Sequence, residues 1–195
     1  MKNVNVILFD DFTLLDVFGP VDVFSRMDSH YRIDYYSHNG GKVKTKPNFE
    51  IETKSFNDIS GFDILMIPGG FGTRKLVYDS KFISDLKNIA EKSEKVMTVC
   101  TGSALLAKTG LLKNIKATSN KMSYDWVTGQ DSDVKWIRKA RWVADGKYYS
   151  SSGITAGIDM ALGFINDMIG GGAADKISHA LEYVWNNDSE EDPFA

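Results

Sequence analysis

The chain has 195 residues, of which 43% are hydrophobic and 25% are charged. This length suits one well-buried domain and is short for two, and the composition argues against disorder. The formal net charge is −3, with Lys and Arg scattered, so no basic patch marks a site for nucleic acid or an anionic membrane. The single cysteine excludes an internal disulfide, and no apolar run approaches a membrane span. We therefore expect one cytoplasmic domain over residues 1–195.

The first part of the chain alternates short apolar runs with longer helical patterns. These patterns predict a strand over residues 4–9, a helix over 14–27, a strand over 31–37, a hairpin over 42–53 and a strand over 63–67. Pro20 is compatible with the first helix only near its first turn or at a kink.

The second part continues the alternation. It predicts a helix over 81–93, a strand over 95–99, a helix over 101–109, a short helix around Tyr124, a hairpin over 140–151, a helix from Thr155 to 169 and a last helix over 173–185. Asp145-Gly146 is the strongest hairpin signal. Strands that alternate with helices in this way are typical of an α/β sandwich of three layers, with a mostly parallel sheet covered on both faces.

Cys100 lies between the predicted strand 95–99 and the predicted helix 101–109. Parallel sheets place ligand sites at the carboxyl ends of their strands. The start of a helix presents free N–H groups and a partial positive charge, which predicts a lowered pKa for the Cys100 thiol. Thr101 and Gly102 are small enough for the tight turn of a nucleophile elbow. An inert buried cysteine is the competing interpretation, but the junction favours a nucleophile.

A second candidate site segment follows the strand 63–67, at Gly69, Gly70 and Phe71. Paired glycines let the backbone approach a ligand, and their N–H groups can face developing negative charge. We predict that these three residues line a substrate or oxyanion pocket together with the amide of Thr101. A simple turn that ends the strand is the alternative.

Asp16 lies among apolar residues just beyond the first strand. Desolvation there would raise the pKa of its carboxyl group and suit it to proton donation. Stabilisation of the helix start, worth about 1 kcal/mol, is the alternative role.

The three histidines, His30, His38 and His179, neighbour none of these motifs. We expect each of them at the surface or in packing, although a Cys–His pair formed in space stays open. No cluster has the spacing of metal ligands, so we expect neither a metal nor an organic cofactor.

Taken together, these motifs resemble those of the ThiJ/PfpI superfamily, which has a class I glutamine amidotransferase-like fold. The resemblance covers nearly the whole chain and rests on residues 16–24, 68–70, 99–103, 153–159 and 181–183. Within the superfamily it is nearest to isonitrile hydratases and to the sensor domains of related transcription regulators. It implies a flavodoxin-like three-layer α/β/α sandwich with a nucleophile elbow, assembled as a homodimer.

The resemblance also implies roles for individual residues. The family nucleophile corresponds to Cys100, the acidic residue that contacts it in the hydratases corresponds to Asp16, and the threonine after the nucleophile is Thr101. Intracellular proteases of the superfamily have histidine at the position of Thr101, which counts against peptide hydrolysis here. Asn120 stands where many relatives have a histidine, and we place it in the substrate pocket.

Three functions follow from these residues. The leading hypothesis is hydration of a small isonitrile to an N-substituted formamide, with Cys100 as nucleophile and Asp16 as acid. A protease-like or amidase-like cysteine hydrolase is the second, although no base accompanies the motif. A non-catalytic ligand sensor or redox-responsive protein is the third. A small molecule is the expected partner in the first case, and DNA binding is not expected because the sequence shows neither a helix-turn-helix domain nor a basic patch.

Overall fold

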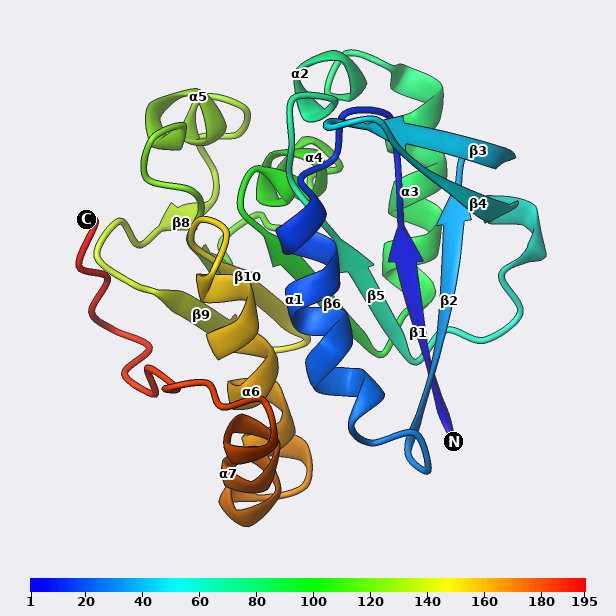
Figure 1. The fold of residues 1–195 in the computed structure, drawn as a ribbon. Helices are drawn as coiled ribbons and strands as arrows, with labels where there is room; N and C mark the ends of the chain where they lie inside the picture. Colours follow the sequence, from blue (N-terminus) through cyan, green and yellow to red (C-terminus); the bar gives the residue numbers. More distant parts are fainter.

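Eight strands form the central sheet of the computed structural model, which describes residues 1–195 (Figure 1). Their order across the sheet is β3-β4-β2-β1-β5-β6-β10-β9. The inner strands pair in parallel, and an antiparallel hairpin closes each edge. The strands are β1 (Lys2–Ile7), β2 (Tyr31–Ser37), β3 (Asn39–Thr45), β4 (Phe49–Ser55), β5 (Ile64–Ile67), β6 (Lys95–Val99), β9 (Trp142–Asp145) and β10 (Tyr148–Ser151).

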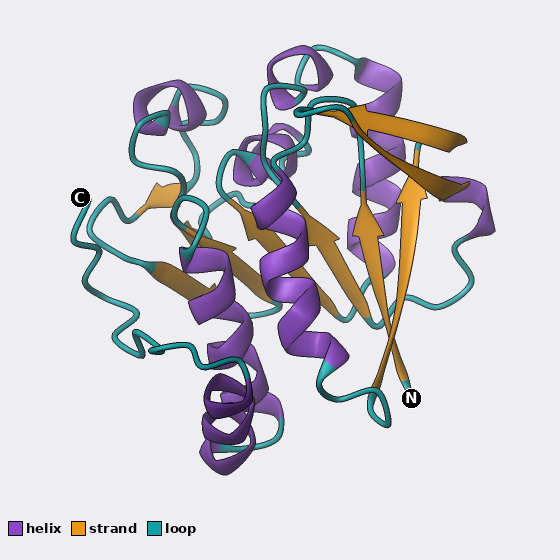
Figure 2. Ribbon diagram, viewed as in Figure 1, coloured by secondary structure: helices purple, strands orange, loops and turns teal.

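Helices cover both faces of this sheet (Figure 2). One face carries α1 (Leu14–Ser25), α6 (Ala156–Met168) and α7 (Gly171–Ala180), and the other carries α3 (Ser80–Lys92) and α4 (Gly102–Lys108). Short elements complete the fold: the 3-10 turn η1 (Phe56–Asp58), α2 (Thr73–Leu76), α5 (Tyr124–Thr128) and the small pair β7 (Lys116–Ala117) and β8 (Lys135–Trp136). None of the helices is both long enough and apolar enough to cross a membrane. The sheet with helices on both faces confirms the predicted three-layer α/β sandwich.

The core explains why the central strands are mostly apolar. Residues of β1 and β5 such as Val6 and Leu65 are fully buried, because helices pack on both faces of a parallel sheet. Phe24 of α1 and Phe164 of α6 meet edge to face with ring centroids 5.7 Å apart, which joins the two helices on one side. All parallel strands point the same way, so their carboxyl ends meet at one edge of the sheet, and α2 and α5 lie beside that edge in Figure 1.

The last helix differs from its prediction. It ends at Ala180, whereas the apolar pattern predicted a helix as far as residue 185. Glu182 has a left-handed backbone with φ of 49°, which breaks the helix. Tyr183 and Trp185 instead donate hydrogen bonds to the side chain and the carbonyl of Asp159. The spacing of Tyr183 and Trp185 therefore resembles that of an apolar helix face, although these residues pack against α6 from a segment that is not helical.

Two other predictions differ in detail. Pro20 lies in the middle of α1, so of the two predicted settings, the first turn or a kink, the first is wrong. Thr155 precedes α6 at the capping position, but its hydroxyl makes no capping bond and accepts from Arg141 instead. The short elements α2, β7 and β8 were not predicted, because two to four residues are too few to show a periodicity.

Candidate active site

Cys100 occupies a sharp turn between β6 and α4. Its φ is 56°, a left-handed conformation that a non-glycine residue adopts only under strain. Gly102 makes the turn possible, because a Cβ atom there would lie 2.3 Å from the carbonyl oxygen of Ile67. This strand-turn-helix geometry is that of a nucleophile elbow. The cysteine is buried, with 6% of its surface exposed.

Two hydroxyl groups hold the backbone of the elbow in place. Ser103 Oγ donates to the carbonyl oxygen of Cys100 at 3.0 Å, and Ser119 Oγ donates to the same oxygen at 2.8 Å. The Cys100 N–H donates to the carbonyl of Ser152, beyond β10. Bonds from three segments thus support the strained residue.

Asp16 is fully buried at the same edge of the sheet, in the first turn of α1. Its Oδ2 accepts a 2.9 Å hydrogen bond from the N–H of Gly69, whereas Oδ1 is buried without a conventional hydrogen-bond partner. Asp16 and Cys100 are close enough for each to shift the pKa of the other. The capping alternative would have required the carboxyl group to bond the N–H groups at the start of its own helix. It instead bonds Gly69 and lies against the elbow.

Gly69 is the residue that lets these groups approach. A Cβ atom on it would lie 2.6 Å from the N atom of Thr101 and 2.9 Å from Oδ2 of Asp16. Any larger side chain would separate the elbow from the carboxyl group. The sequence predicted that a glycine here lets the backbone approach a ligand. The glycine does allow close approach, but the groups it approaches are Thr101 and Asp16 of the protein itself.

The N–H groups of the two glycines are both engaged inside the protein. Gly69 donates to Asp16, and Gly70 donates to Oγ1 of Thr101 at 3.0 Å. Thr73 Oγ1 extends this network, with bonds to the Gly70 carbonyl and to Thr101 Oγ1. These contacts do not match the predicted oxyanion role of Gly69 and Gly70, since neither donor is free. The Thr101 amide, which lies beside the sulfur, is the remaining predicted donor.

Burial determines the acidity of the pair. It raises the pKa of Asp16 to about 7, in the direction that the sequence predicted. Burial and the neighbouring Asp16 raise the pKa of the Cys100 thiol, and the Thr101 amide only partly opposes this. The predicted lowering of the Cys100 pKa by the helix start is therefore wrong. Helix α4 has only seven residues, and desolvation of the thiol raises the pKa more than the start of this helix lowers it.

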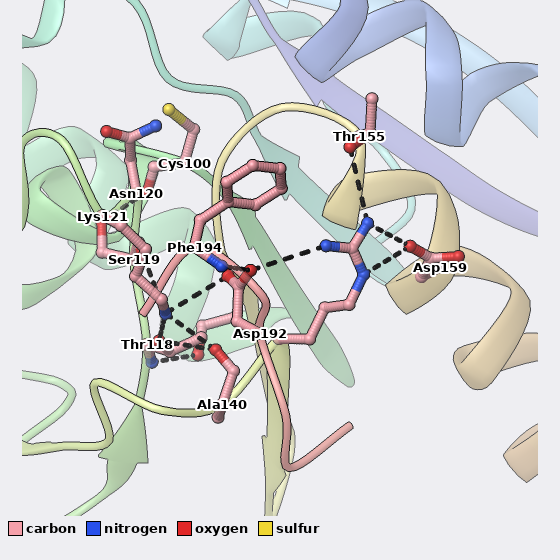
Figure 3. Close-up of polar contacts among 12 residues, drawn as sticks. Cys100, Thr118, Ser119, Asn120, Lys121, Ala140, Thr155, Asp159, Asp192 and Phe194 are labelled. Carbon is pink, nitrogen blue, oxygen red and sulfur yellow. Dashed lines mark hydrogen bonds and ion pairs between the residues drawn. The ribbon is translucent and has the colours of Figure 1, made fainter. Parts of the chain in front are cut away.

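The other two predicted pocket residues, Phe71 and Asn120, make no hydrogen bond to Cys100 or Asp16. Phe71 is 84% exposed on the loop after Gly70. Asn120 is half-buried, its Oδ1 accepts from the Ser123 N–H, and its amide nitrogen packs against Gly153, where a Cβ atom would lie 2.3 Å away. Figure 3 shows Asn120 on the loop that also carries Ser119.

The histidines make no contact with the elbow. His38 pairs with Asp85 at 2.8 Å, and His30 bonds Ser29. Sequence reasoning missed Ser119 and Thr73, which both reach the site network. Their only signal was a hydroxyl near the carboxyl end of a strand, which is too common to single out a residue.

The chain is similar to proteins of a known family. The model of the DJ-1/PfpI family matches residues 2–167. Isonitrile hydratase from Pseudomonas putida is 33% identical over 132 residues, which span 68% of this chain and 57% of the hydratase. A deglycase from Thermococcus kodakarensis is 29% identical over 114 residues, which span 57% of this chain and 67% of the deglycase.

Solved structures agree with the fold. A ThiJ/PfpI family protein from Pseudomonas syringae has a TM-score of 0.84 at 25% identity. The matched region covers 93% of this chain and 75% of the Pseudomonas syringae chain. DJ-1beta from Drosophila melanogaster has a TM-score of 0.80 at 21% identity, with coverage of 94% and 99%. The second likeness concerns the fold alone.

Proposed function

Because the chain belongs to the DJ-1/PfpI family, we propose that it is a cysteine-dependent enzyme that hydrates a small isonitrile to an N-substituted formamide. The observation that carries this proposal is the buried Asp16 carboxyl group against the Cys100 elbow, with no histidine bonded to either group. A nucleophile with one tuned acid suffices for this reaction. The likeness to isonitrile hydratase over 68% of the chain supports the same choice.

The active pair holds one proton, either on the sulfur or on the carboxyl group. In the first step the Cys100 sulfur bonds to the terminal isonitrile carbon, and Asp16 delivers the proton to that carbon. The product is a thioimidate, R–N=CH–S–Cys100, and Asp16 is left as a carboxylate. The Gly69 N–H donates to Oδ2 throughout, which leaves the free Oδ1 for proton transfer.

Hydrolysis then completes the cycle. Water adds to the thioimidate carbon while the Asp16 carboxylate takes one of its protons and passes it to the nitrogen. The tetrahedral adduct, R–NH–CH(OH)–S–Cys100, collapses as its C–S bond breaks. Its hydroxyl proton returns to the pair, and the formamide leaves. Overall one isonitrile and one water give one formamide, and the enzyme regains its proton.

The geometry favours this reaction over amide hydrolysis. Acyl transfer benefits from a general base and from free oxyanion donors. Here the N–H groups of Gly69 and Gly70 are bonded to Asp16 and Thr101. A terminal isonitrile carbon carries no oxygen, so its attack needs no oxyanion donor in the first step.

Turnover of a simple alkyl isonitrile, followed as formamide by proton NMR, tests the proposal. We expect formamide production by the wild-type protein, none by Cys100→Ala, and a reduction of at least about 100-fold in Asp16→Asn. Asp22→Asn is the matched control, because Asp22 is an exposed carboxylate on the same helix. Full activity in Cys100→Ala, or no formamide from the wild-type protein, would reject isonitrile hydration.

A further inference from the structure

Four buried side chains with alternating charge form a row that ends at Lys121, on the loop that also carries Ser119 and Asn120 (Figure 3). Asp159 pairs with Arg141 at 2.6 Å, Arg141 lies 3.8 Å from Asp192, and Asp192 lies 3.6 Å from the ammonium of Lys121. The side chains are between 0% and 7% exposed. The row is neutral as a whole, with two cations and two anions.

Asp192 is the one anion in ion-pair contact with Lys121. The other partners of the Lys121 ammonium are uncharged oxygens: Thr118 Oγ1 at 3.0 Å, and the carbonyls of Ala140 at 2.8 Å and Ser119 at 3.4 Å. Arg141 has a tight partner of its own in Asp159. Loss of the Asp192 charge would therefore leave Lys121 as the uncompensated buried cation.

Asp192 is also the one buried side chain of residues 181–195. Tyr183 and Trp185 also bond to Asp159, and Glu191 pairs with Lys139 at the surface. Backbone bonds add to these contacts, from the Arg141 and Trp142 N–H groups to the Ser189 carbonyl and from the Asp192 N–H to the Lys139 carbonyl. A cleft of about 850 Å³ separates much of it from β9, α6 and α7. Beyond Trp185, polar anchors rather than an apolar face thus keep this segment in place.

Lys121 ends the loop 118–121, which supports the nucleophile. Ser119 of this loop donates to the Cys100 carbonyl at 2.8 Å, and the Thr118 N–H donates to Ser150 Oγ of β10. A displacement of Lys121 would move Ser119 and remove one of the two hydroxyl bonds that hold the strained elbow.

We propose that Asp192 is a positioning residue for Cys100: its carboxylate holds the Lys121 ammonium, and with it the loop 118–121 that fixes the elbow. The catalytic part of this inference rests on the proposed function, whereas the effect on the cysteine does not. A loosened elbow makes Cys100 more accessible and at the same time less well placed. Alkylation and turnover therefore change in opposite directions.

The experiment compares Asp192→Asn with the wild-type protein and with Glu191→Gln. Glu191 is the neighbouring residue and pairs with Lys139 at the surface, so it is a matched control. We expect Asp192→Asn to react with iodoacetamide at least about fivefold faster and to turn over isonitrile about tenfold more slowly. Asp192→Glu should recover most of both values, and Glu191→Gln should stay within twofold of the wild type.

A second variant separates positioning from simple charge balance. Lys121→Met with Asp192→Asn leaves no unpaired buried charge, so it should fold even where Asp192→Asn does not. If Asp192 positions Cys100, the double variant keeps the fast alkylation. Alkylation at the wild-type rate in the folded double variant would overturn the inference. Without isonitrile turnover in the wild-type protein only the proposed function fails, because the alkylation rates still decide this inference.

Discussion

Gly69 donates its N–H to Oδ2 of Asp16 at 2.9 Å and so joins the loop after β5 to the first turn of α1, at the carboxyl edge of the sheet. The bond uses one carboxyl oxygen and leaves Oδ1 buried and unpaired. A buried polar atom without a partner costs free energy, and such costs are typically kept where function needs them. The unpaired oxygen is thus the natural place for the mobile proton of the pair.

Gly69→Ala tests this close approach. The new methyl group would lie 2.6 Å from the Thr101 N atom, so the elbow and the carboxyl group must move apart. We expect a loss of isonitrile turnover of at least about 100-fold and a loss of about 1–3 kcal/mol in the free energy of unfolding. Gly172→Ala is the control, because a Cβ atom there meets nothing within 4 Å. It should leave turnover unchanged; similar turnover in both variants would contradict the role of Gly69.

The pH dependence of turnover reports the Asp16 carboxyl group. Burial raises its pKa to about 7, and below that pH the pair carries a second proton that blocks attack by sulfur. We therefore expect kcat/KM to rise with pH along a limb with an apparent pKa near 7. The Asp16→Asn variant should lack this limb in its residual activity. A flat profile between pH 5 and pH 8 in the wild-type protein would count against Asp16 as the titrating group.

Asp16→Asn should also stabilise the protein at neutral pH. The folded-state pKa of Asp16 is raised, so its stabilising contribution is complete below about pH 4 and is lost as the pH rises to about 7. The neutral amide has no such loss and can still accept from the Gly69 N–H. We expect its free energy of unfolding in urea to exceed that of the wild type by up to about 4 kcal/mol at pH 8. The difference should shrink towards pH 4; a constant difference would contradict the raised pKa.

Thr101 can be tested by separating its hydroxyl from its shape. Thr101→Val leaves the Gly70 N–H without its acceptor, which costs roughly 1–3 kcal/mol in the free energy of unfolding. We expect turnover to fall by about tenfold or more, because the turn at Gly70 loses its bond to the elbow. Thr101→Ser retains the hydroxyl and should keep turnover within a few-fold of the wild type. A loss in Thr101→Ser but not in Thr101→Val would show that the methyl group, not the hydroxyl, matters.

Local patterns were sufficient for most of the fold. The apolar runs of β1, β5 and β6 were predictable because strands covered on both faces need apolar side chains at most positions; Asn5 and Thr98 are the buried polar exceptions. The elbow at Cys100 was predictable for a similar reason, since small residues must follow a nucleophile at the end of a buried strand. The end of the last helix was not, because Tyr183 and Trp185 are held by Asp159 of another helix.

The sequence by itself therefore determined the layers, the position of Cys100 at the elbow and the approximate place of Asp16, because each depends on a pattern within a few neighbouring residues. Tertiary structure alone decided the acidity of Cys100, since burial beside Asp16 outweighs the short helix that follows. It also decided which partners the Gly69 and Gly70 amides take, and it brought Asp192 to Lys121. Desolvation and ion pairing depend on what surrounds a group in space, and residues far apart in the chain supply those surroundings.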